Sequence, residues 1–154
     1  MCSSDLAFEV MSGLETLALR MERHCENAKQ AAEYLDKHNL VEWVRFPGLK
    51  GDPAFELSEK YLQGTGGTMV VFGIKGGKDA GQIFIDNLKM FRHVANVGDT
   101  RSLAIHPATT THSQLDEDQL IAAGSPPELI RLSIGIEDIE DILGDLGQAL
   151  ESAS

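Results

Sequence analysis

The sequence predicts a single α/β domain built as a two-layer sandwich, in which a small sheet is covered on one face by helices. Its 154 residues suffice for one domain with a hydrophobic core. The hydrophobic fraction of 42% and the charged fraction of 24% are typical of a globular protein. Segments with the apolar spacing of a helix alternate along the chain with short β-rich segments, an order that favours helices packed on a sheet.

The first strong segment is a helix at residues 13–38, where apolar residues recur at helical spacing. Ser12 and Glu15 have the spacing of a capping box, which favours a helix start at this point. An earlier start remains open, because Val10 and Met11 extend the same apolar stripe.

Residues 41–74 are expected to form two strands around a short helix. Residues 41–46 alternate apolar and charged side chains, which is the pattern of a half-buried strand. Pro53 suits the first position of a helix at residues 54–62. The continuous β-rich run at residues 68–74 predicts a central strand.

Three further elements follow in the second half of the chain. Apolar spacing predicts a helix at residues 78–91. Residues 103–106 form a short strand that Pro107 ends. Residues 116–123 form a short helix, closed by Gly124 at the first position beyond its end.

The last two elements are a strand at residues 129–134 and an amphipathic helix that starts near Ile139. Glu137 and Asp138 precede this helix, where its dipole favours negative charge. Neither the order nor the direction of the strands follows from these patterns.

Arg131 is the first candidate functional residue, because it interrupts the apolar run at residues 129–134. Burying a guanidinium is costly unless it meets an anion. Pattern alone favours a strand face in water, on which Arg131 and Ser133 are solvated. The alternative is a guanidinium that grips a carboxylate through paired N–H groups.

Asn96 is the second candidate. It begins the small and polar segment Asn96-Val97-Gly98-Asp99, between a predicted helix and a predicted strand, where binding loops are common. Taken alone, this segment favours a plain turn.

Charge and composition limit the partners. The formal net charge of −11 and the lack of a basic stretch argue against nucleic acid. No apolar run reaches the roughly 18 residues of a membrane span. Cys2 and Cys25 lack paired spacing, which favours a reducing, cytoplasmic setting. His93, His106 and His112 lack the spacing of a zinc site, so no metal is expected.

Several long motifs resemble one family of enzymes, the O-acetylhomoserine sulfhydrylases. They are GLETLALRMERH at residues 13–24, VEWV and PGL within residues 41–49, ANVGDTRSLAIHPATTTH at residues 95–112, and IRLSIGIEDIEDI at residues 130–142. The resemblance runs from about residue 7 to residue 150. It places the chain in the Cys/Met metabolism branch of fold-type I enzymes that depend on pyridoxal 5′-phosphate.

The resemblance implies a C-terminal substrate-binding domain at residues 13–154, after a lead-in at residues 1–12 whose native status the sequence leaves open. It implies that Arg131 binds the α-carboxylate of the substrate and that Asn96 lies beside it. The implied reaction replaces the acetate of O-acetylhomoserine by sulfide and yields homocysteine, with pyridoxal phosphate as the electron sink.

The resemblance also implies that the large cofactor-binding domain is missing. In the family the Schiff-base lysine lies upstream, and none of the seven lysines here has that sequence context. We therefore expect catalytic residues to be absent, the chain to be inactive alone, and the full-length enzyme to be a homotetramer. The alternative is a stand-alone amino-acid-binding or interaction module derived from this domain.

Overall fold

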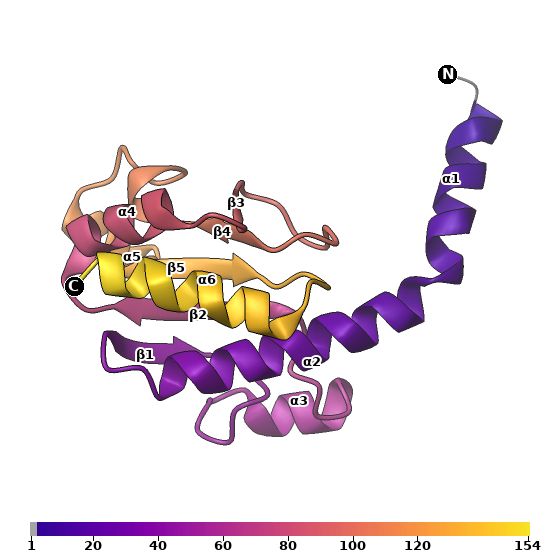
Figure 1. The fold of residues 1–154 in the computed structure, drawn as a ribbon, viewed down its shortest axis with the longest axis horizontal. Coiled ribbons are helices and arrows are strands. Elements are labelled where there is room, and N and C mark those ends of the chain that lie inside the picture. Colours follow the sequence, from indigo (N-terminus) through magenta and orange to yellow (C-terminus); the bar gives the residue numbers. More distant parts are fainter. Residues whose placement is uncertain (1–2) are drawn as a thin grey trace.

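The computed structural model describes residues 3–154, whose helices and strands are labelled in Figure 1. The helices are α1 (Ser3–Glu15), α2 (Leu17–Asp36), α3 (Phe55–Tyr61), α4 (Gly77–Asn87), the 3-10 turn η1 (Pro107–Thr109), α5 (Glu117–Ala122) and α6 (Ile139–Ser152). The strands are β1 (Val41–Arg45), β2 (Met69–Ile74), β3 (Arg92–His93), β4 (Leu103–Ile105) and β5 (Leu129–Ser133).

The strands form one mixed sheet in the order β1-β2-β5-β4-β3. Only the pairing of β3 with β4 is parallel among the described strands, and the other neighbours run antiparallel. The predicted central strand at residues 68–74 is β2, and it lies next to the strand that carries Arg131. In the middle of the sheet, one row of paired residues crosses four strands, namely Arg45, Val71, Arg131 and Ile105.

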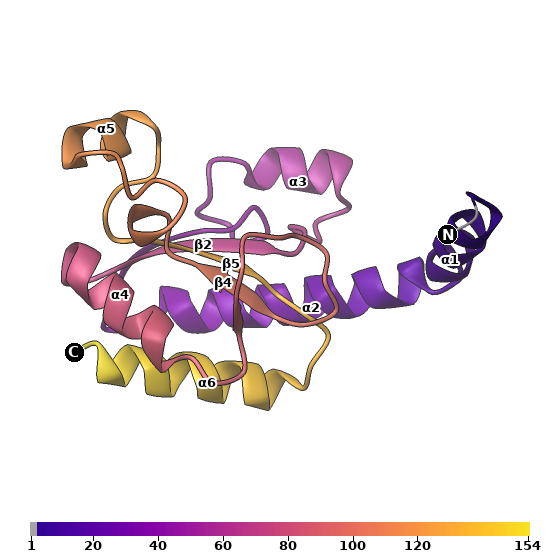
Figure 2. The same ribbon diagram turned by 90° about the horizontal axis from the view of Figure 1, so that it is seen from above.

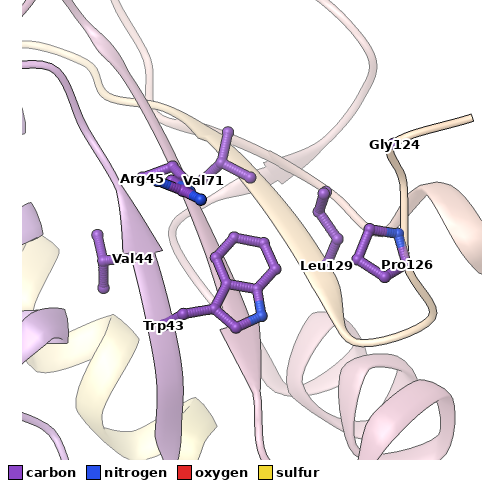
Figure 3. Close-up of a pocket in the computed structure, with 7 residues that line it drawn as sticks. All are labelled: Trp43, Val44, Arg45, Val71, Gly124, Pro126 and Leu129. Atoms are coloured by element: carbon purple, nitrogen blue, oxygen red, sulfur yellow. The ribbon is translucent and has the colours of Figure 1, made fainter. Parts of the chain in front are cut away.

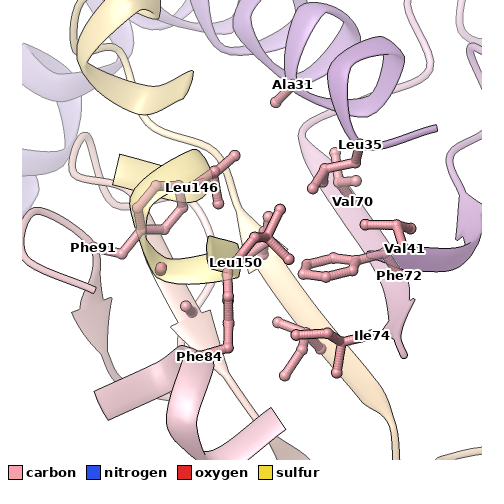
Figure 4. Close-up of a cluster of buried hydrophobic side chains, with 14 of the residues drawn as sticks. Ala31, Leu35, Val41, Val70, Phe72, Ile74, Phe84, Phe91, Leu146 and Leu150 are labelled. Carbon is pink, nitrogen blue, oxygen red and sulfur yellow. The ribbon is translucent and has the colours of Figure 1, made fainter. Parts of the chain in front are cut away.

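Two layers make up the body of the molecule, as the sequence predicted. Helices α2, α4 and α6 lie on one face of the sheet, whereas the short helices α3 and α5 lie on the other side (Figure 2). The hydrophobic core fills the space between the sheet and helices α2, α4 and α6 (Figure 4). In that core Phe72 of β2 meets Phe84 of α4 edge to face, with ring centroids 5.5 Å apart.

The N-terminal helix begins earlier than the capping-box spacing suggested. Ser12 lies inside α1, and the helical run breaks at Thr16, which caps α2 without a side-chain hydrogen bond. Helical structure does start earlier, as the alternative allowed, but the predicted single helix is divided at Thr16 into two helices. Helix α1 extends away from the body (Figure 1) and leaves large apolar side chains such as Phe8, which is 73% exposed, in solvent.

Helix α4 ends four residues before the predicted end at residue 91. The buried carboxylate of Asp145, on α6, accepts the backbone N–H groups of Lys89, Met90 and Phe91. Those donors are thereby satisfied outside a helix, and the chain turns into β3, a strand that the sequence did not predict.

Of the predicted ends of the shorter helices, those of α5 are confirmed and the start of α3 is not. Asp116 caps α5 through a capping box with Gln119, and Gly124 follows the helix with a φ of +72°. Pro53, however, precedes α3 rather than opening it, because Ala54 is the N-cap residue. Within residues 3–154, no helix combines the length and apolarity that crossing a bilayer requires.

Candidate functional site

Arg131 lies at the centre of the sheet. Its strand, β5, runs between β2 and β4, and Arg131 is paired with Val71 on one side and with Ile105 on the other. Its neighbours Ile130 and Leu132 are fully buried in the core on the helical side. Since side chains alternate along a strand, Arg131 emerges on the opposite, more open face.

Arg131 differs from the other five arginines of the chain. It is partly buried, yet within residues 3–154 its guanidinium has neither a hydrogen-bond partner nor an ion pair. The other unpaired arginines, Arg45 and Arg92, are exposed, where water solvates the charge. A partly desolvated cation without a protein partner favours a bound anion, and a planar guanidinium suits a carboxylate.

A hollow of about 430 Å³ lies over the neighbouring strand β4, and Arg131 is not among its lining residues. Its lining residues are His93, Val94, Ala95, Ile105, Thr110 and Thr111. Ile105 is the direct cross-strand neighbour of Arg131, so the hollow begins one strand away from the guanidinium. The sequence shows Thr110 and Thr111 only as members of the motif at residues 95–112, and the fold brings them next to residues 93–95.

Asn96 follows Ala95, a wall residue of this hollow, and is exposed. Its Oδ1 accepts the N–H of Val97 at 2.9 Å, and its own N–H donates to the carbonyl of Val94 at 3.1 Å. In the described part of the chain, no hydrogen bond joins Asn96 to Arg131. Neither candidate lines the hollow itself: Asn96 follows its wall residue Ala95, and Arg131 pairs with its wall residue Ile105.

The loop after Asn96 is closed by an ion pair. The guanidinium of Arg101 donates to both carboxylate oxygens of Asp99, at 3.1 and 2.9 Å, and the backbone N–H of Arg101 donates to the same carboxylate at 3.0 Å. These hydrogen bonds lower the pKa of Asp99 to about 2, so the pair is charged at neutral pH.

After that pair, the end of the loop is hydrogen-bonded to the segment that follows β5. Glu137 accepts the backbone N–H of Ser102 at 2.6 Å and its hydroxyl at 2.9 Å. Ser102 Oγ in turn accepts the N–H of Gly135 at 2.9 Å. Sequence reasoning treated Glu137 only as a charge at a helix start, because a bond over 35 residues leaves no local signal.

The buried His106 supports the threonine wall of the hollow. Its Nδ1 is 3.0 Å from Thr109 Oγ1 and its Nε2 is 2.7 Å from the carbonyl of Pro127, while its own carbonyl accepts the Thr110 hydroxyl at 2.7 Å. Burial lowers the pKa of His106. Across residues 3–154, no three His, Cys, Asp or Glu side chains gather where they could hold a metal ion.

A second and larger hollow, of about 720 Å³, lies over β1 and β2, and its lining residues are drawn in Figure 3. It is lined by Trp43, Val44, Arg45, Val71, Gly124, Pro126 and Leu129. Trp43 is held there by a hydrogen bond from Nε1 to Glu128 Oε1 at 3.2 Å. Val71 separates this hollow from Arg131, which pairs with it across the sheet.

The lysines of the chain do not fit a covalent site for pyridoxal phosphate. A Schiff-base lysine is normally activated in a desolvated pocket. All seven lysines here are exposed, and none lines either hollow. Within residues 3–154, the two hollows therefore present no enclosed amine for covalent chemistry.

Comparisons with known proteins identify the family of the chain. The chain is 49% identical over 144 residues to O-acetyl-L-homoserine sulfhydrylase 1 of Thermus thermophilus, covering 94% of this chain and 34% of that protein. It is 50% identical over 147 residues to the O-acetyl-L-homoserine sulfhydrylase of Leptospira meyeri, and 43% identical over 145 residues to an L-methionine gamma-lyase of Fusobacterium nucleatum. The chain spans about a third of the length of these relatives.

A solved structure shares the fold. It is a Campylobacter jejuni chain described as an O-acetylhomoserine (thiol)-lyase, which carries an N′-pyridoxyl-lysine phosphate group. The two chains are 41% identical with a TM-score of 0.84, over 92% of this chain and 34% of that one. Residues 1–151 also match the sequence profile of the Cys/Met metabolism PLP-dependent enzymes. This chain belongs to that family.

Proposed function

We propose that this chain is the C-terminal substrate-binding domain of an O-acetylhomoserine sulfhydrylase (O-acetylhomoserine aminocarboxypropyltransferase). The observation that carries the proposal is the partly buried, unpaired guanidinium of Arg131 on the open face of the sheet. Similarity to several O-acetylhomoserine sulfhydrylases, at about half identical residues, supports the substrate. Sulfide is the second substrate, and the products are homocysteine and acetate.

In this proposal the chain binds and orients the amino-acid substrate. Arg131 donates two parallel N–H bonds to the α-carboxylate, and the Asn96 amide adds a third donor from the loop. The hollow lined by Ile105 and the threonines accommodates the rest of the substrate. Pyridoxal phosphate, when bound to the rest of the enzyme, supplies an electron sink for the replacement at Cγ.

The remainder of the assembly is part of the same proposal. A large domain upstream of this chain carries the Schiff-base lysine, so the present chain alone is not catalytic. The complete enzyme is a cytoplasmic homotetramer that acts in methionine biosynthesis and transsulfuration. The identities with three O-acetyl-L-homoserine sulfhydrylases and a homocysteine synthase are 48–51%, against 42–43% with two methionine gamma-lyases and 43% with two fungal sulfhydrylases. The higher values support O-acetyl-L-homoserine as the substrate.

Calorimetric titration of this chain with O-acetyl-L-homoserine tests the carboxylate clamp. Arg131→Ala is expected to weaken binding at least roughly tenfold, because a charge-assisted pair is lost. Arg45→Ala is the matched control, since Arg45 lies in the same row of the sheet, about 10 Å away across two strand spacings. Equal affinities of the wild-type chain and Arg131→Ala would refute the assignment of Arg131.

A hybrid enzyme tests the reaction. In it, the C-terminal third of the Thermus thermophilus sulfhydrylase is replaced by this chain, and homocysteine formation from O-acetyl-L-homoserine and sulfide is measured. The hybrid is expected to be active, and Arg131→Lys is expected to raise KM, because an ammonium group cannot form the two parallel bonds. A folded hybrid that eliminates the substrate without adding sulfide would favour a lyase instead.

A further inference from the structure

The segment that leaves β5 just after Arg131 is bonded on two sides. On one side α2 holds its carbonyl groups, since His24 Nδ1 lies 2.6 Å from the carbonyl of Ile134 and Asn27 Nδ2 donates to the carbonyl groups of Gly135 and Glu137 at 3.1 and 2.9 Å. The side chains of His24 and Asn27 are buried. The backbone directly after the Arg131 strand is therefore fixed to the helical layer.

On the other side, the same segment holds the end of the Asn96 loop. Glu137 accepts both donors of Ser102, its N–H and its hydroxyl, and the Ser102 hydroxyl oxygen accepts from Gly135. The backbone N–H of Ile136 donates to the carbonyl of Thr100 at 2.9 Å. Ser102 is fully buried, so these bonds are shielded from competing water.

The packing at this junction leaves no spare volume. A Cβ at Gly135 would lie 2.5 Å from the carbonyl oxygen of Thr100 and 2.6 Å from the nitrogen of Ser102, and it would also overlap the Glu137 carboxylate. These contacts are closer than real side chains show, so the junction tolerates little displacement of either segment.

We propose that Glu137 is a positioning residue for substrate binding, which holds the Asn96 loop at a set distance from Arg131. Only residues 97–101 separate Asn96 from the Ser102 anchor, and the Asp99–Arg101 pair shortens the free part of this loop. Glu137 follows Arg131 by six residues, on a backbone that α2 also holds. One carboxylate thus links the two donors that the proposed function assigns to the substrate carboxylate, and the inference rests on that function.

A ligand-free measurement tests the link first. In this chain, Glu137→Gln removes one acceptor oxygen and the charge, so amide exchange and backbone relaxation by NMR are expected to show faster exchange and greater motion at residues 96–101. Asp138→Ala is the matched control, because Asp138 caps α6 and does not bond to the loop. It is expected to lower the unfolding temperature while leaving the loop ordered. Unchanged loop order in Glu137→Gln would overturn the inference.

A double-mutant cycle with O-acetyl-L-homoserine then tests the consequence. Glu137→Gln is expected to weaken binding roughly tenfold, and Asn96→Ala is expected to add little in that background, because the loop is already displaced. Independent, multiplicative losses would contradict the positioning role. Failure of the proposed function has a different signature: the wild-type chain would not bind the amino acid, although loop order would still depend on Glu137.

Discussion

Arg131 owes its place to the strand that carries it and not to hydrogen bonds of its own. Val71 and Ile105 flank it across the sheet, and the core holds β5 from behind through Ile130 and Leu132. The sheet thereby fixes the backbone of Arg131, whereas its unpaired guanidinium keeps rotamer freedom that the carboxylate of the proposed function would restrict.

His106 is expected to make the stability of the chain sensitive to mild acid. Burial lowers its pKa from 6.5 in the folded chain, so the unfolded chain binds more protons between the folded pKa and about 6.5. The stabilisation is complete above pH 6.5 and is lost as the pH falls below that value. Denaturant unfolding of the wild-type chain and His106→Gln between pH 7.5 and 5 should show a shallower loss in the variant, and equal slopes would contradict this.

Gly73→Ala is expected to displace Trp43, the single tryptophan of the chain. A Cβ at Gly73 would overlap the indole nitrogen and its neighbouring carbons, so the bond from Trp43 to Glu128 would break. Tryptophan fluorescence should shift to longer wavelength as the ring becomes more exposed. Gly144→Ala is the control, because a Cβ there meets no atom within 4 Å. An unchanged fluorescence spectrum in Gly73→Ala would contradict the expected displacement of the Trp43 indole.

At the scale of the elements, α4 and α6 depend on each other through one carboxylate. Asp145 of α6 satisfies the three backbone donors that follow α4, and it is only 7% exposed. The bonds cross more than 50 residues of sequence. The length of α4 is therefore decided by a residue of another helix.

Asp145→Ala is expected to destabilise the chain by about 2–4 kcal/mol, because buried N–H groups lose their acceptor. Glu151→Ala, an exposed position on the same helix, should change stability by less than about 0.5 kcal/mol. Urea unfolding of the three proteins gives the comparison. A loss below about 1 kcal/mol for Asp145→Ala would mean that water replaces the carboxylate at these donors.

At the scale of the whole molecule, the core and α1 are separate in space. The core lies between the sheet and helices α2, α4 and α6 (Figure 4), while α1 projects from the end of α2 (Figure 1). The apolar residues of α1 are exposed, among them Leu6, Phe8, Val10, Met11 and Leu14. Helix α1 buries little apolar surface and so contributes little to the stability of the body.

Removal of residues 1–15 is accordingly expected to leave the thermal unfolding midpoint within about 3 °C of the original, because less than about 1 kcal/mol of burial is lost. The exposed stripe should also promote self-association, which the deletion should reduce at high protein concentration. Calorimetry and sedimentation velocity measure the two effects. A large drop in the midpoint would show that α1 packs on the body in solution.

Local patterns were sufficient for much of the fold. The longer strands and helices α3, α5 and α6 were predicted close to their observed positions, and Asp116 and Gly124 marked the ends of α5 correctly, whereas the separate helix α1 was not predicted and α4 ends four residues early. The correctly predicted features depend on neighbours within four residues, which a sequence displays directly. The alternation along β5 placed Arg131 opposite Ile130 and Leu132, but the expectation that Arg131 and Ser133 are solvated was wrong, because Ser133 is only 3% exposed and Arg131 is partly buried.

Only the tertiary structure determined the features that join distant segments of the chain. Strand order and register placed Arg131 between Val71 and Ile105 and one strand away from a hollow whose wall comes from residues 93–95 and 110–111. The pairing of Ser102 with Glu137 likewise depends on the folded chain. The sequence by itself determined which residues form each element and which face of a strand is apolar, because short-range sterics and periodicity control both. The site required the fold, because its neighbours are distant in sequence and meet only once the sheet has its register.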